Sequence, residues 1–289
     1  PSSTTHYAFS TVLKMVNSYY LRGEPVLKPF LVDTFGNPIF LPPGFPSPQV
    51  IDDPFTINIT DDPEPLHEVE TFGFSGKIMA DLPFDLRLTS ITAYRGVEFK
   101  TDVDSDFTEA PGVLAEVRED QEQFSQEFQL HGANGDLIWV GGLFYLYEND
   151  DFKIGMQSPF FGQLMFGTPD FGMQTIASVK TNAYAAYVQG DYALNDRLSA
   201  TAGIRYSYEK KSLDKIDAIF VGGFDVTFGG LTQETSVDWN AWTPKFGLQY
   251  EVSSDILVYA SVTRGFKSGG FNPALIQSFF DPEYLWAYE

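Results

Sequence analysis

An unbroken alternation of apolar and polar residues over 198–209 constrains the fold more than any other feature of the sequence. Side chains of a strand point alternately to opposite faces, so this segment has one apolar and one polar wall. The preceding residues 181–193 alternate in the same way, and Leu194-Asn195-Asp196 between the two halves favour a turn. The predicted hairpin has strands of about ten residues or more, which suits a tilted strand that crosses a bilayer.

Composition supports this reading and excludes several classes of protein. No run of apolar residues is long enough for a transmembrane helix, but a membrane strand escapes that test because only every second residue is apolar. The chain contains 27 Phe, 15 Tyr and 4 Trp, as expected where aromatic side chains line both membrane interfaces. The absence of Cys excludes a disulfide scaffold. The net charge of −21 argues against a nucleic-acid partner and fits acidic surface loops.

Short and long connections alternate along the chain. Period-two patterns predict further strands near 67–80, 84–100, 119–132, 136–149, 237–252 and 256–267. The short connections are 81–83, 134–135, 194–196 and 253–255, and the long ones are 101–118, 150–177, 212–236 and 268–282. Outer-membrane barrels have short periplasmic turns and long extracellular loops, so we predict an all-β, antiparallel transmembrane β-barrel. Pro244 lies inside a predicted strand, where we expect a bulge or weak pairing.

The two ends of the chain are less regular. Residues 1–65 carry many prolines, and we expect one strand or helix followed by a long Pro-rich extracellular loop there. Residues 66–289 are expected to hold about eight clear barrel strands. The chain starts at Pro1, and its last residues, 286–289, form the start of a further amphipathic pattern. We therefore expect this chain to be an internal piece of a longer protein.

No catalytic or metal-binding constellation is found in the sequence. His6, His67 and His131 lie far apart and lack metal-ligand spacing. Asp102, Asp104 and Asp106 resemble the start of a calcium loop, but Phe107 and Val113 occupy the positions that require Gly and Glu. We expect no enzyme activity, no cofactor and no metal site.

Several segments, in this order, resemble the barrel of TonB-dependent receptors, the active outer-membrane importers of Gram-negative bacteria. Each motif alone is weak, and the ordered set over residues 66–289 is specific. The segments are Leu88–Arg95 (LTSITAYR), Phe124–Leu130 (FSQEFQL), Trp139–Tyr145 (WVGGLFY), Ala202–Tyr206 (AGIRY), Thr243–Leu248 (TPKFGL), Tyr259–Asn272 (YASVTRGFKSGGFN), and Pro282-Glu283 with Tyr288-Glu289.

The resemblance implies that this chain is part of a larger receptor. Such receptors have a barrel of about 22 strands with a plugged lumen. A plug domain precedes the barrel, and a short segment before the plug engages TonB. We expect both the plug and the TonB-binding segment to be missing from this chain, so that the barrel here is incomplete.

The resemblance also implies a location and partners. Outer-membrane lipid, lipopolysaccharide, TonB, the protein's own plug and a small-molecule substrate are the expected partners, in the outer membrane of a Gram-negative bacterium. An iron–siderophore complex is the first expected substrate, with haem, cobalamin or a glycan as alternatives. Two other functions stay open at this point, namely a passive porin-like barrel and a soluble, secreted β-sandwich that binds glycans.

The faces of the predicted strands give candidate site residues. Side chains on the apolar wall should face lipid; the residues are Ala200, Ala202, Ile204, Tyr206, Phe246 and Leu248. Polar residues of the opposite wall and aromatic residues of a long loop are the candidates for ligand binding in the lumen or loops; they are Arg205, Glu209, Lys245, Gln249, Phe224 and Phe228.

Overall fold

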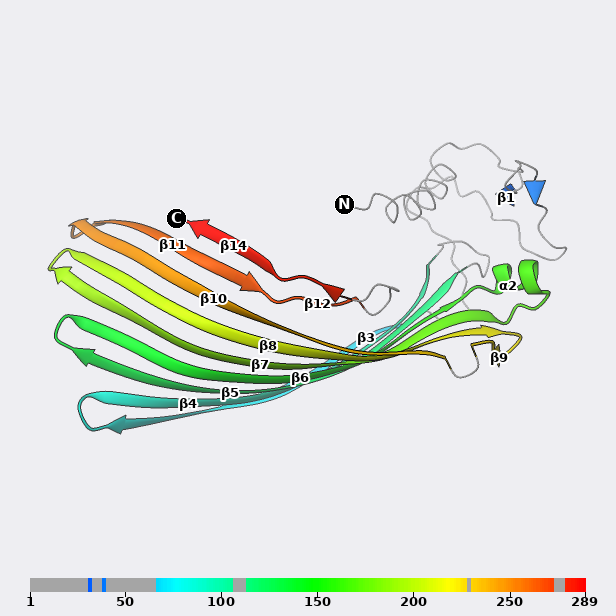
Figure 1. The fold of residues 1–289 in the computed structure, drawn as a ribbon, viewed down its shortest axis with the longest axis horizontal. Helices are drawn as coiled ribbons and strands as arrows, with labels where there is room; N and C mark the ends of the chain where they lie inside the picture. The colour runs from blue at the N-terminus through cyan, green and yellow to red at the C-terminus, as the bar shows by residue number, and fades with distance from the viewer. Residues whose placement is uncertain (1–30, 33–37, 40–65, 106–112, 228–229, 273–278) are drawn as a thin grey trace.

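A computed structural model describes residues 31–32, 38–39, 66–105, 113–227, 230–272 and 279–289. Its main body is one sheet of ten strands (Figure 1). The long strands are β3 (Leu66–Leu82), β4 (Leu86–Asp104), β5 (Leu114–Asn134), β6 (Leu137–Gln157), β7 (Phe171–Asn195), β8 (Leu198–Val221), β10 (Leu231–Ser253) and β11 (Ile256–Lys267). The short elements are β1 (Leu31–Val32), β2 (Pro38–Ile39), β9 (Phe224–Asp225), β12 (Gly270–Phe271), β13 (Phe279–Phe280), β14 (Glu283–Tyr288) and the helix α2 (Pro159–Phe166).

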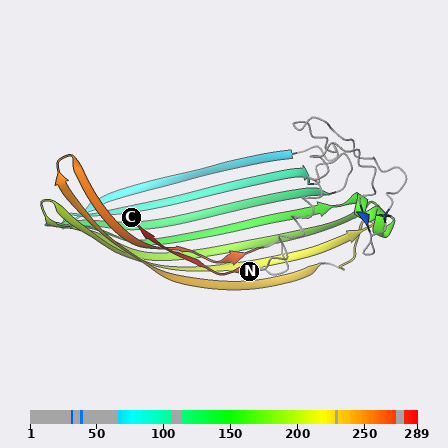
Figure 2. The ribbon, with the colours of Figure 1, turned by 90° about the horizontal axis from the view of Figure 1, so that it is seen from above.

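The strands pair antiparallel in sequence order, from β3 at one edge through β11 to β14 at the other, with β9 attached to β8. The two edge strands do not pair with each other, so the sheet is open; it is also curved rather than flat (Figures 1 and 2). This confirms the predicted all-β, antiparallel class with an unclosed barrel. The pairs β1–β2 and β12–β13 form separate two-stranded sheets.

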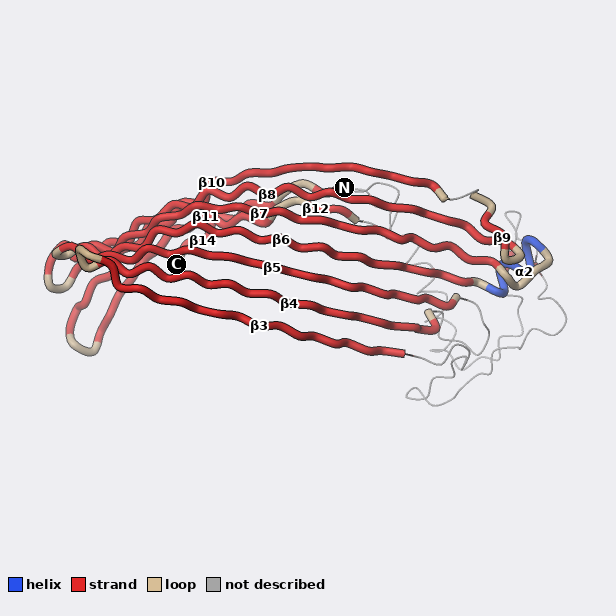
Figure 3. Tube along the Cα trace, turned by 90° about the horizontal axis from the view of Figure 1, so that it is seen from below, coloured by secondary structure: helices blue, strands red, loops and turns tan. Residues whose placement is uncertain are grey.

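The two ends of the sheet differ, as the alternation of connections predicted. Tight turns gather at one end, and α2 and β9 lie at the other (Figure 3). The turn residues are 83–85, 135–136, 196–197 and 254–255, within one or two positions of the prediction. The first turn differs most, because Phe84 and Asp85 have positive φ of 66° and 58° and precede the strand instead of beginning it.

Three of the four predicted long loops are shorter than expected, because the strands continue into them, whereas the connection between β11 and β14 spans 268–282 as predicted. Strand β7 begins at Phe171 rather than near Thr181, and β8 runs on to Val221. Along these extensions both faces carry polar side chains, so the apolar-polar alternation disappears although the hydrogen-bond ladder continues. Strands β4 to β8 and β10 have 19 to 25 residues and project well beyond a bilayer, which a tilted strand crosses in about 9–11 residues.

One face of the sheet, here called the belt face, carries apolar side chains near the turns. The register aligns Ala200 with Leu248, and Ala202 with Phe246. Ile204 is 43% exposed, Phe246 55% and Leu248 54%, high values for apolar residues inside strands. The opposite face, here called the polar face, carries Arg205 and Glu209. All six residues predicted to face lipid lie on the belt face.

A row of aromatic rings bounds the apolar part of the belt face, and we call it the ring row. Tyr145 on β6 contacts Tyr184 on β7 at 5.0 Å between ring centroids, and Tyr184 contacts Tyr208 on β8 at 6.4 Å. Tyr206 on β8 contacts Trp242 on β10 at 4.8 Å between ring centroids, which extends the row to β10. From Leu137 to Tyr147 the strand rises about 33 Å along its own axis. For a tilted strand this is about 25 Å along the membrane normal, which matches the apolar band of a membrane barrel.

Three polar side chains lie on the belt face within this band and form hydrogen bonds with one another. The Thr92 hydroxyl donates to Oε1 of Gln126 at 2.6 Å, and Nε2 of Gln126 donates to the Ser90 hydroxyl at 3.0 Å. An unpaired polar group in an apolar environment is costly, so the trio can lie on this face because its members are bonded to each other.

Pro244 is accommodated without a bulge toward β8, where it pairs with Ile204 in continuous register. The ladder from β10 to β11 begins at the next residue, Lys245, which pairs with Thr263. The expected bulge is therefore absent, and the missing donor coincides with the end of the β10–β11 pairing.

Candidate functional site

The polar face carries a cross-strand cluster around Arg205 on β8. The guanidinium carbon lies 5.5 Å from the ring centroid of Phe144 on β6 and 5.7 Å from that of Tyr187 on β7, and Nε donates to the Ser207 hydroxyl at 3.1 Å. Among the described residues, no carboxylate forms an ion pair with Arg205. The cation is thus held by two rings, an arrangement that leaves it able to accept an anionic partner.

Tyr187 links this cluster to β5. Its hydroxyl donates to Oε1 of Glu127 at 2.5 Å. Gly142 lies directly opposite Tyr187 in the ladder, and a Cβ at Gly142 would lie 2.4 Å from the tyrosine ring. Only glycine lets the ring lie across β6 at this point. Tyr187 and Phe144 were not among the predicted site residues, although an aromatic residue at a polar-wall position of the alternation was a usable signal.

Glu209 lies on the polar face of β8, four residues beyond Arg205. It pairs with Lys211 at 3.0 Å and accepts a hydrogen bond from the Ser268 hydroxyl at 2.5 Å. Ser268 directly precedes Gly269, where a Cβ would lie 2.5 Å from the Trp239 ring. These contacts hold the start of the segment with β12 and β13 against the polar face.

Beyond the ring row, this segment covers an acidic part of the polar face. A cavity of about 350 Å³ lies between Phe271 and Phe280 on one side and Glu148, Asp150 and Lys211 on the other. Burial, with the nearby charge of Glu119 added, raises the pKa of Asp150 to about 6. One carboxylate oxygen of Asp150 is shielded from solvent and has no hydrogen-bond partner.

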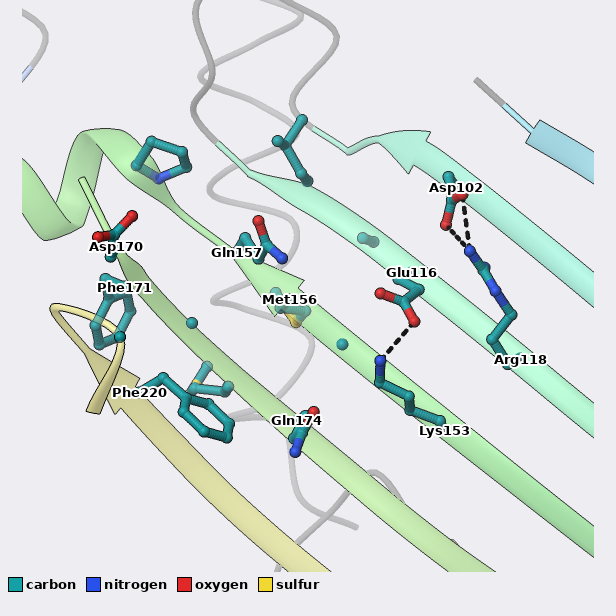
Figure 4. A pocket seen from close by; sticks show the side chains of 17 residues that line it. Asp102, Glu116, Arg118, Lys153, Met156, Gln157, Asp170, Phe171, Gln174 and Phe220 are labelled. Atoms are coloured by element: carbon teal, nitrogen blue, oxygen red, sulfur yellow. Dashed lines mark hydrogen bonds and ion pairs between the residues drawn. The ribbon is translucent and has the colours of Figure 1, made fainter. Parts of the chain in front are cut away.

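A hollow of about 870 Å³ lies near the end of the sheet that carries α2 (Figure 4). Two ion pairs line it, Arg118 with Asp102 at 2.7 Å and Lys153 with Glu116 at 2.7 Å. The register places these four residues on the belt face, beyond the ring row. The hollow therefore opens on the side of the sheet away from Arg205, and four of its charged residues are in ion pairs.

Helix α2 and an aromatic cluster lie beside this hollow. Ser158 caps the helix by accepting a hydrogen bond from the Phe161 amide at 3.4 Å, and Gly167 ends it with φ of 71°. Phe171 contacts Phe161 at 5.0 Å and Phe166 at 5.4 Å, so these loop aromatics pack on one another. Sequence analysis missed this helix, although Ser-Pro at its start and Gly at its end are ordinary helix signals.

The six predicted ligand-binding residues do not converge on one site. Gln249 pairs with Ser199, ten positions from Glu209 along β8, a separation of about 33 Å in an extended strand. Lys245 is exposed on the polar face, one row from Arg205. Phe224 is 77% exposed on β9, and Phe228 lies outside the described residues. Of the five candidates that the structure describes, only Arg205 has a side chain held between aromatic rings.

In the part of the chain that the structure describes, no group of three or more His, Asp or Glu side chains is placed to hold a metal ion. No helix among the described residues is long and apolar enough to cross a membrane.

Comparison with known families identifies the chain. The model of the β-barrel of TonB-dependent receptor-like proteins matches residues 17–289. The chain therefore belongs to the TonB-dependent receptor family and is part of its β-barrel. Members of this family are receptors and transporters rather than enzymes, and they lie in the outer membrane of Gram-negative bacteria, which is the location of this protein.

A solved structure agrees with this chain on the fold. The ferric yersiniabactin uptake receptor FyuA from Yersinia pestis matches with a TM-score of 0.59 and 18% identity over 76% of this chain and 32% of that chain. The ferric citrate transporter FecA matches with a TM-score of 0.46 and 14% identity over 68% of this chain and 27% of that chain, too weakly to carry an argument. The chain thus spans about a third or less of the length of these receptors.

Proposed function

We propose that this chain forms part of the barrel wall of an active outer-membrane importer that takes up a scarce nutrient with energy supplied through TonB. The observation that supports this most is the family match over residues 17–289. The two unlike faces of the sheet support it as well, because a barrel needs an apolar exterior and a polar interior.

The proposed orientation places the belt face toward lipid and the polar face toward the lumen. Ala200, Ala202, Ile204, Tyr206, Phe246 and Leu248 would then contact acyl chains. The tight turns would lie in the periplasm, and α2 with the longer connections would lie outside the cell. The open edges β3 and β14 would pair with further strands of the full-length receptor, because a bilayer does not tolerate unpaired backbone. Residues 66–289 are accordingly assigned to the barrel.

Arg205 is the proposed contact for an anionic group inside the lumen. Its guanidinium lies between Phe144 and Tyr187, which orient it without neutralising its charge. The anionic group would come either from the plug of the full-length receptor or from the substrate. Glu209 is the weaker candidate, because Lys211 and Ser268 already occupy its carboxylate.

Iron–siderophore complexes are the first substrates to test, ahead of haem, cobalamin and glycans. The name of FyuA records the uptake of a ferric siderophore, and its structure shares the fold of this chain at 18% identity. A shared fold at that identity supports the choice of iron–siderophore complexes for the first assay. It does not favour any particular siderophore.

A growth assay tests the proposal. A strain that lacks its own ferric-siderophore receptors would express the full-length receptor, with a panel of ferric siderophores as the only iron source. We expect growth on at least one complex, dependent on both the receptor and TonB. Uptake that persists without TonB would overturn the active mechanism and favour a passive pore. Failure on every iron complex while haem or cobalamin supports TonB-dependent uptake would overturn only the substrate class.

The role of Arg205 can be tested in the same strain. We expect Arg205→Ala to lower the initial rate of TonB-dependent uptake by about tenfold, because a charge-assisted contact is lost. Arg205→Lys keeps the charge and should retain more of the rate. Lys77→Ala, at another polar-face position, is the matched control. Equal rates in all three variants would remove Arg205 from the proposed site.

A further inference from the structure

The chain that follows β11 lies against the polar face beyond the ring row, and we call its described residues, 268–272 and 279–282, the strap. The strap contains β12 and β13, which pair Gly270 with Phe280 and Phe271 with Phe279. It includes the end of the motif YASVTRGFKSGGFN, which neither the lipid-facing residues nor the cluster around Arg205 explains. The contacts of the strap with the wall show what this end of the motif does.

The strap is anchored at its start. The Ser268 hydroxyl donates to Oε1 of Glu209 at 2.5 Å, and Lys211 pairs with the same carboxylate at 3.0 Å. Gly269 follows directly and is buried against Trp239, where a Cβ would lie 2.5 Å from the indole ring. A side chain at this position would lift the strap from the wall, so the first glycine of the motif sets how closely the strap lies.

The second glycine shapes the strap itself. Gly270 is buried, and a Cβ there would lie 2.6 Å from the ring of Phe280 on β13. The absence of a Cβ lets this ring approach the backbone of β12. Phe271 and Phe280 together form an uncharged wall of the cavity of about 350 Å³ described above.

The opposite wall of this cavity is acidic. Three carboxylates line it, Glu119 on β5 and both Glu148 and Asp150 on β6. Lys211 also lines the cavity, and it is already paired with Glu209. The negative charges of this wall therefore outnumber the positive charge that the described residues bring to it.

The strap covers the acidic wall without neutralising it. Among the described residues, the strap contributes Gly270, Phe271 and Phe280 to the cavity, and none of them carries a charge. One carboxylate oxygen of Asp150 is shielded from solvent and has no hydrogen-bond partner. Such a carboxylate is costly when it is ionised and far less costly when it is protonated. Closure of the strap and protonation of the wall should therefore favour each other.

We propose that the strap is a pH-sensitive latch, which is held on the polar face while Asp150 is protonated and is released when Asp150 ionises. The strap would pivot about Ser268 and Glu209, neither of which lines the cavity. Under the orientation proposed above, its release would open the acidic wall to the lumen. The latch goes beyond the proposed function, because it would operate in a passive pore as well as in an active importer.

The direction of the response follows from the pKa of Asp150. Burial is the largest cause of the rise of this pKa from 3.8 to about 6, and the negative charges of Glu119, Glu148 and Asp151 add to it. Release returns Asp150 to water, so its pKa falls back toward 3.8. Protonation therefore stabilises the closed strap fully below about pH 4, and this stabilisation is lost as pH rises through about 6.

The test measures the position of the strap in the full-length receptor in lipid vesicles. Spin labels at Asn272→Cys in the strap and Ser254→Cys in a tight turn report one distance by double electron–electron resonance. Both positions are exposed, this chain has no cysteine of its own, and any cysteine elsewhere in the receptor is replaced by serine.

We expect one distance at pH 4.5 and a second, displaced population at pH 7.5. A pKa of 3.8 for the released and about 6 for the closed strap lowers the closed-to-released ratio by up to about twentyfold between these pH values. An unchanged distance distribution in the parent would overturn the latch.

Three substitutions separate the latch from other causes. Asp150→Asn has no charge to lose and should keep the closed distance at both pH values. Asp238→Asn makes the same change at an exposed carboxylate on the belt face of β10 and should respond to pH as the parent does. Gly270→Ala should give the released distance at both pH values, because its Cβ meets the Phe280 ring.

Heat-modified migration on gels confirms that each of these variants is folded. A pH response that survives in Asp150→Asn would overturn the role of Asp150, and a closed distance in Gly270→Ala would overturn the packing that the latch requires. The measurement involves no transport, so its failure is distinct from failure of the proposed function.

Discussion

The two halves of strand β8 share one hydrogen-bond ladder and differ in almost everything else. From Leu198 to Tyr208 the belt face is apolar and at least partly exposed, with Ile204 at 43%. From Lys210 to Val221 the same face carries charged and apolar residues, while the polar face buries Leu213 to 2% exposure. The difference shows that period-two alternation appears only where one face of a strand is apolar and the other is polar. The strand itself continues beyond the point where the two faces become alike.

A charge on the apolar half gives the largest expected contrast. Ile204→Arg should destabilise the full-length receptor in lipid vesicles by about 2–4 kcal/mol if the site lies near the bilayer midplane. Ser212→Arg, on the same face of the same strand beyond the ring row, should cost less than about 0.5 kcal/mol. Urea unfolding of the vesicle-inserted protein measures both. Equal effects of the two substitutions would show that the belt face does not meet lipid.

Leu213 tests the half of β8 that lies beyond the ring row. Leu213→Ala should cost about 2–3 kcal/mol, because a side chain with 2% exposure leaves a cavity. Leu231→Ala is the control, since Leu231 is 65% exposed in the same polar outer half. The same urea experiment reads both variants. A cost for Leu213→Ala no larger than that of the control would mean that the outer half has no packed core.

The ring row marks the border between the two halves. Tyr184→Ala removes the ring contacts with Tyr145 and Tyr208 and should cost about 1–2 kcal/mol. Tyr184→Phe keeps the ring and should stay within about 0.5 kcal/mol of the parent. If the phenylalanine variant were as destabilised as the alanine variant, the hydroxyl rather than the ring contacts would matter at this border.

Asp150 gives the smallest effect and concerns pH. Its pKa is raised by burial to about 6, so the native state binds a proton more readily than the unfolded chain does. Stability should therefore fall as pH rises from about 4 through about 6, the pKa values of the unfolded and the native carboxyl, and Asp150→Asn should remove that part of the dependence. Glu119, Glu148, Glu209 and Lys211 also face this region, so the parent and the variant must be compared at each pH.

The control for this pH experiment is Asp238→Asn, which changes an exposed carboxylate on the belt face of β10. We expect thermal unfolding of this variant to keep the pH dependence of the parent. If Asp150→Asn also kept it, titration of another group would account for the dependence.

The family, the antiparallel class and the six belt-face positions were all accessible from the sequence. Alternation over 198–209 requires only that neighbouring side chains point to opposite faces, and this is a property of a single strand. The same reasoning failed beyond the ring row. Once both faces are polar, a strand such as the start of β7 at Phe171 has the composition of a loop, so the predicted loops were too long.

Contacts between strands were decided by the tertiary structure alone. Arg205 lies beside Tyr187 and Phe144, and Lys100 lies opposite Arg118, because of register, which depends on every turn and strand length between the partners. A shift of one residue would move each of these side chains to the other face. The sequence therefore determined what each face of this barrel wall is made of, and the pairing of the strands determined which residues meet.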